Sequence, residues 1–86
     1  MHNDKSDELL RCLRRYEVPL LHAVALLARL RGVSLNQIAR SAGLHRNSLY
    51  HALAGRVRPS AGLRETVTRM LGVDPWEIYE RSEEDG

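Results

Sequence analysis

Apolar residues recur every three or four positions along most of this chain, and that spacing predicts helices rather than strands. Six helical segments can be placed, at about 7–16, 19–31, 35–42, 46–54, 61–71 and 76–79. Segment 19–31 is apolar almost all round, so it needs a packing partner on two sides. The pattern therefore predicts an all-α domain.

Capping residues mark the ends of these segments. Ser6, Ser34 and Ser60 each stand where a helix N-cap is expected, and Asp74 with Pro75 marks the last helix start. Pro19 suits the first turn of the second helix. Glycines end four of the helices: Gly32, Gly43, Gly55 and Gly72. In the first helix, we expect Leu9, Leu13 and Tyr16 to form the apolar stripe.

Segment 46–54 divides sharply into two faces at 100° per residue. One face carries Arg46, Asn47, Tyr50 and His51, and the other carries three apolar residues: Leu49, Ala52 and Leu53. Arg pairs bidentately with guanine and Asn with adenine, so the polar face suits contacts with base edges. The alternative is an ordinary solvated helix face. Ser48 lies at the edge and is predicted to contact a phosphate.

Charge is distributed unevenly along the chain. Residues 1–28 sum to zero, residues 29–69 carry 8 − 1 = +7, and residues 70–86 carry 1 − 6 = −5. A central block this basic indicates a polyanionic partner, and we predict nucleic acid.

Several other classes of function find no support in the sequence. A chain of 86 residues is one small domain, and its one cysteine, Cys12, is predicted to be a buried small hydrophobe. The histidines have no metal-ligand spacing, and no catalytic constellation stands out, so we expect no cofactor, metal or enzymatic activity. The apolar run 18–30 is too short to span a membrane, and we expect a cytoplasmic protein.

Three stretches together resemble the Cro/C1-type (XRE-like) helix-turn-helix family: GVSLNQIARSAGLHRNSLY at 32–50, GRVRPS at 55–60 and LGVDPW at 71–76. The resemblance covers about residues 20–79. It implies a five-helix, lambda-repressor-like DNA-binding domain, here with an extra N-terminal helix, whose third helix enters the major groove. It also implies phosphate contacts from Ser34, Asn36, Gln37, Arg56 and Arg58.

Two positions depart from the family pattern. Ala52 is smaller than the branched residue usual there, which predicts a repacked core beneath the recognition helix. Leu53 replaces a frequent Glu and is expected to add to an apolar surface.

The chain is expected to divide into an extra N-terminal helix (1–17), the helix-turn-helix domain (18–80) and an acidic tail (81–86). The extra helix either covers the outer side of segment 19–31 within one chain or exchanges with a second subunit to build a dimer. The residues predicted for such a dimer interface are Leu9, Leu10, Leu13, Tyr16, Leu20 and Leu21.

These observations favour a sequence-specific regulator that binds double-stranded DNA. We predict a dimeric repressor that acts by occupying a palindromic operator. Two alternatives stay open. One is an antitoxin-like DNA-binding protein that also inhibits a protein partner. The other is a protein-interaction module that keeps the fold without binding DNA.

Overall fold

The computed structural model describes residues 4–81, with side chains described for residues 5–80. The helices in this range are α1 (Asp4–Arg15), α2 (Leu20–Leu30), α3 (Leu35–Ser41), α4 (Arg46–Leu53), α5 (Ala61–Leu71) and α6 (Pro75–Arg81). No strand occurs among the described residues, so the prediction of an all-α fold is confirmed. Residues 82–86 of the predicted acidic tail lie outside the described part.

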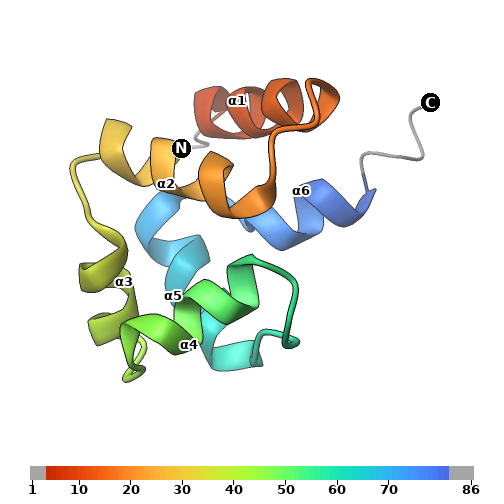
Figure 1. The fold of residues 1–86 in the computed structure, drawn as a ribbon. Helices are drawn as coiled ribbons and strands as arrows, with labels where there is room; N and C mark the ends of the chain where they lie inside the picture. The colour runs from red at the N-terminus through yellow and green to blue at the C-terminus, as the bar shows by residue number, and fades with distance from the viewer. Residues whose placement is uncertain (1–3, 82–86) are drawn as a thin grey trace.

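The helix α2 connects the two ends of the molecule (Figure 1). It contacts α1 on one side and both α4 and α6 on the other. The short helices α3 and α4 pack together at the end away from α1, and α5 lies against α3. None of the helices in the described range is long and apolar enough to cross a bilayer.

Packing on two sides explains why α2 is apolar almost all round. Its buried side chains are Ala23, Val24, Leu27 and Ala28. Full burial of one leucine contributes about 1.5–3 kcal/mol, so α2 is a main source of stability. Two leucines of α2 are left on the surface, however: Leu26 is 41% exposed and Leu30 is 67% exposed.

The helix α1 is fastened to the rest of the chain by burial and by hydrogen bonds. Leu10 is fully buried in the core. The Arg14 Nε donates to the carbonyl oxygen of Tyr79 at 3.3 Å, and the Tyr79 hydroxyl donates to the carbonyl oxygen of Val18 at 2.7 Å. Burial raises the pKa of the Tyr79 phenol, which keeps the hydroxyl protonated as a donor. Helix α1 is thus an integral part of the domain.

Two predictions for the first helix are wrong. The helix begins at Asp4, so Ser6 is not its cap. Ser6 lies inside the helix, where its buried hydroxyl accepts a hydrogen bond from Arg31 Nη1 at 3.3 Å. Tyr16 was predicted to belong to the apolar stripe of the first helix, but it follows the end of the helix in a turn and is 78% exposed.

The turn after α1 contains a residue in a strained conformation. Helices α2, α3 and α4 are each followed by a glycine with positive φ and a pair of closing backbone hydrogen bonds. The same pair closes α1: Val18 N donates to Leu13 O and Glu17 N to Arg14 O, both at 2.9 Å. There the left-handed position is held by Glu17, with φ of 62°. A side chain at that φ carries a steric cost of about 1–2 kcal/mol.

We predict that Glu17→Gly raises the free energy of unfolding by up to about 1 kcal/mol, because the strain removed exceeds the added backbone entropy of the unfolded chain. Urea unfolding at neutral pH measures the change. Glu17→Ala is the matched control, since it removes the same charge but keeps the strained conformation. Equal stability of the two variants would contradict this prediction.

Candidate nucleic-acid interface

The four residues predicted to contact bases lie together on the solvent side of α4. We call Arg46, Asn47, Tyr50 and His51 the base-contact face. All four residues are exposed, and Tyr50 is 39% exposed. The opposite side of α4 is buried through Leu49, Ala52 and Leu53. The division of this helix into two faces, predicted from its sequence, is therefore present in the structure.

The turn between α3 and α4 determines the direction in which the base-contact face points. Gly43 adopts φ of 74°, where a Cβ would meet no atom within 4 Å. The glycine is therefore required by the backbone conformation and not by a close approach. The Leu44 amide donates to the carbonyl oxygen of Ala39 at 2.9 Å, and the Gly43 amide donates to Arg40 at 3.0 Å. These two hydrogen bonds end α3 and set the direction in which the chain leaves it toward α4.

His45 caps α4, a role that we did not predict from the sequence. Its Nδ1 accepts a hydrogen bond from the backbone N–H of Asn47 at 3.1 Å. An accepting Nδ1 means that the neutral ring carries its proton on Nε2. Because N-caps are most often Ser, Thr, Asp or Asn, the sequence signal for this cap was weak. The cap fixes the first turn of α4, which carries Arg46 and Asn47.

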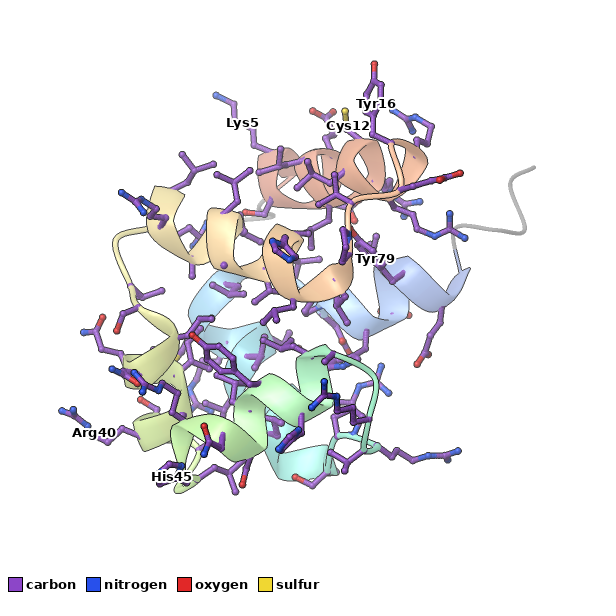
Figure 2. The ribbon with its side chains drawn as sticks, viewed as in Figure 1. Lys5, Cys12, Tyr16, Arg40, His45 and Tyr79 are labelled. Carbon is purple, nitrogen blue, oxygen red and sulfur yellow. The ribbon has the colours of Figure 1, made fainter. Side chains whose placement is uncertain are left out.

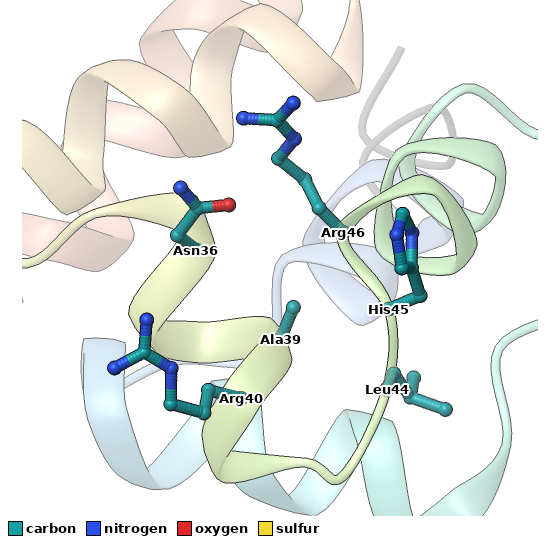
Figure 3. Close-up of a pocket in the computed structure, with 6 residues that line it drawn as sticks. All are labelled: Asn36, Ala39, Arg40, Leu44, His45 and Arg46. Carbon is teal, nitrogen blue, oxygen red and sulfur yellow. The ribbon is translucent and has the colours of Figure 1, made fainter.

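A hollow lies between α3 and α4, beside the base-contact face (Figure 3). Asn36, Ala39 and Arg40 of α3 line one side, and Leu44, His45 and Arg46 line the other. The Arg46 guanidinium extends toward the part of α3 that carries the Asn36 amide, whereas the Arg40 guanidinium points away from α4. All three groups are hydrogen-bond donors. This composition suits an anionic oxygen. Arg40 is a further candidate contact, and it was not among the residues predicted from the sequence.

The residues predicted to contact phosphates fall into two groups. Ser34 and Gln37 form a capping box at the start of α3, in which Gln37 N donates to Ser34 Oγ and Ser34 N donates to Gln37 Oε1, at 3.1 and 2.8 Å. Their principal role in the structure is thus to cap α3. The other four have exposed side chains near α4: Asn36, Ser48, Arg56 and Arg58.

Positive charge near α4 is not offset by acidic residues of the same segment. Between Glu17 and Glu65 the chain contains no acidic residue. Arg64 of the basic block forms an ion pair, because its Nη2 lies 2.8 Å from Asp74 Oδ2. The hydrogen bond to Asp74 raises the pKa of Arg64. Arg64 therefore joins α5 to α6, whereas Arg46, Arg56 and Arg58 face solvent.

Trp76 of α6 supports α4 from the core side. Its indole Nε1 donates to the carbonyl oxygen of Ala52 at 3.4 Å, and the residue is 4% exposed. The small residue in this contact is Ala52, beneath which we expected a repacked core. The expectation that Leu53 adds to an apolar surface is wrong, because Leu53 is 2% exposed and belongs to the core.

The residues predicted for a dimer interface lie in different environments. Leu10 is fully buried within its own chain and is not at the surface. Tyr16 is exposed, and four are half-buried: Leu9, Leu13, Leu20 and Leu21. Of the two arrangements considered for the first helix, the structure has α1 packed on α2 of the same chain. Dimerisation itself stays a prediction.

A comparison with protein-family models matches residues 4–76 to the family described as "Probable addiction module antidote protein". The chain belongs to this family. Comparisons with curated proteins and with solved structures found no match. The match to the antidote family begins at the start of α1, whereas the helix-turn-helix resemblance begins near residue 20. Helix α1 is therefore part of what the antidote family has in common.

We predict that His45→Ala destabilises the protein by about 1 kcal/mol, because the Asn47 amide loses its cap at the start of α4. His45→Asn should restore most of this loss, since asparagine is a strong N-cap. Thermal or urea unfolding of the three proteins tests the prediction. If the alanine and asparagine variants are equally destabilised, the capping role of His45 is wrong.

Proposed function

We propose that this protein is an antitoxin-like transcriptional regulator that binds double-stranded DNA in a sequence-specific manner. The observation that carries the proposal is the base-contact face: four polar side chains exposed on one side of α4, with the other side buried. The antidote family supports the regulator class. The resemblance to the Cro/C1-type family supports insertion of α4 into the major groove.

In this proposal the two kinds of side chain near α4 have different tasks. Arg46 and Asn47 select the sequence by bidentate bonds to guanine and adenine, and each good pair contributes about 1–3 kcal/mol of discrimination. Arg56 and Arg58 neutralise phosphates and hold the protein in register. The hollow lined by Arg40 and Arg46 receives an oxygen of a DNA phosphate group.

Regulation would follow from occupancy of the operator. Two copies of the chain would place their α4 helices about 34 Å apart on successive major grooves of a palindrome. The bound dimer blocks transcription without a separate effector domain. As an antidote, the protein would also bind and inhibit a protein partner. The family match favours this antitoxin-like alternative over a repressor with no protein partner.

Substitution of Arg46 tests the base contact. We expect Arg46→Ala to lose about 1–3 kcal/mol of binding to the specific site and much less on random DNA. The site is obtained by footprinting the DNA upstream of the gene, and affinities are measured by fluorescence anisotropy at physiological salt. The matched control is Arg69→Ala, which removes an exposed arginine of α5 outside the proposed interface. An equal loss on specific and random DNA would rule out base recognition by Arg46.

Arg58 tests the phosphate contacts separately. We predict that Arg58→Ala weakens binding to all sequences alike and lowers the slope of log K against log salt by about one. Titrations at several salt concentrations give this slope. An unchanged slope would remove Arg58 from the set of phosphate contacts. If the wild-type protein binds no DNA at any salt concentration, the third interpretation, a protein-interaction module, takes the place of this proposal.

A further inference from the structure

An apolar surface extends over α1 and α2, and no element within residues 4–81 covers it. We call it the outer apolar face, and it consists of Leu9 and Cys12 of α1, Tyr16 of the turn after α1, and Leu26 and Leu30 of α2. Tyr16, Leu30 and Leu26 are 78%, 67% and 41% exposed, and Leu9 and Cys12 are half-buried. Spacings of three and four residues place Leu9 with Cys12, and Leu26 with Leu30, on one side of their helices. Leu9 and Leu30 line a common groove, and exposed apolar surface of this kind marks an interaction site.

The face is hollowed where Leu9 of α1 and Leu30 of α2 meet. A groove between α1 and α2 is lined by Lys5, Ser6, Leu9, Leu27, Leu30 and Arg31. Its floor is leucine, and a groove of this kind between two helices accepts the apolar side of an amphipathic helix.

The charge around the groove identifies the kind of partner. Both charged residues that line it, Lys5 and Arg31, are basic, and Arg31 also donates to Ser6 within the groove. Arg29 of α2 is exposed nearby, and Glu8 of α1 is the exposed acidic residue beside Leu9. A second copy of the chain would bring a like-charged groove against this one, which is unfavourable. A helix with acidic side chains beside its apolar stripe is complementary to the leucine floor of the groove and to the basic side chains around it.

We propose that the outer apolar face binds an amphipathic helix of a partner protein, with apolar side chains in the groove and acidic side chains at Lys5, Arg29 and Arg31. This inference rests on the proposed function, because the partner is the protein that the antidote inhibits. It adds the surface that is used and the chemistry of the segment that is bound.

The proposed docking surface leaves the base-contact face free. Lys5, Cys12 and Tyr16 lie on the side of α1 that faces away from the molecule, at the opposite end from Arg40 and His45 (Figure 2). The two surfaces share no residue. One chain can therefore hold DNA and the partner helix at the same time.

The test uses the full chain and two labelled synthetic peptides, both with a leucine stripe at helical spacing. One peptide carries glutamates beside the stripe and the other carries lysines. By fluorescence anisotropy, we expect the glutamate peptide to bind at least about tenfold more tightly than the lysine peptide. Leu30→Glu should weaken its binding about tenfold or more, since it removes an apolar contact and adds a like charge.

Matched variants separate docking from folding and from DNA binding. Ala61→Glu adds the same charge at an exposed position of α5 and should leave peptide affinity unchanged. Leu26→Glu is a second variant of the outer apolar face, in case Leu30→Glu fails to fold. Leu30→Glu should keep wild-type affinity for DNA.

Three results would overturn the inference: equal affinity for the two peptides, binding of neither, or self-association in sedimentation that Leu30→Glu abolishes. The last result would assign the face to a second copy of the chain. Failure of the peptide experiment with DNA binding intact removes this inference alone. Absence of DNA binding with peptide binding intact removes the DNA-binding part of the proposed function instead.

Discussion

The angle between α3 and α4 is the constraint on which the candidate interface depends. It is fixed in the backbone by Gly43 at φ of 74° and by the 2.9 Å hydrogen bond from the Leu44 amide to the Ala39 carbonyl. Below that turn, Ile38 and Leu49 are both fully buried in one core. Because a protein interior is close-packed, this arrangement cannot shift by small steps, and α4 points outward in one defined direction.

A helix as short as α4 gets its order from its surroundings. An isolated helix shorter than about 12 residues is marginal in water, and α4 has 8 residues. Burial of Leu49 and Leu53, the Trp76 contact with Ala52, and the His45 cap hold it in place. The base-contact face is therefore ordered before any ligand arrives, which reduces the entropy that binding would cost.

Features that depend on neighbouring residues in the sequence could be predicted, whereas contacts between distant parts of the chain could not. The bounds of α5 and its Ser60 cap were predicted correctly, because the signals are local. The start of α1 was not, since Ser6 is a typical cap residue in sequence but lies inside a helix that begins at Asp4. The Arg64–Asp74 pair joins two helices, and periodicity within one helix gives no information about it. The same limit applies to the base-contact face, whose exposure could be predicted but whose orientation could not.

Coupling between the two ends of the molecule can pass through α2 or through α6. Helix α2 contacts α1, α4 and α6, and α6 contacts α1 and reaches α4 through the Trp76 bond to Ala52. Near the start of α2, Leu20 and Leu21 border hollows shared with α4 and the following loop, and Leu30 near its end borders the groove beside α1. A partner that only seats in that groove leaves DNA affinity unchanged, because coupling requires different contacts in two states. A partner that shifts α2 along its axis would move the support of α4, and its effect on DNA affinity would be matched by an equal effect of DNA on partner affinity.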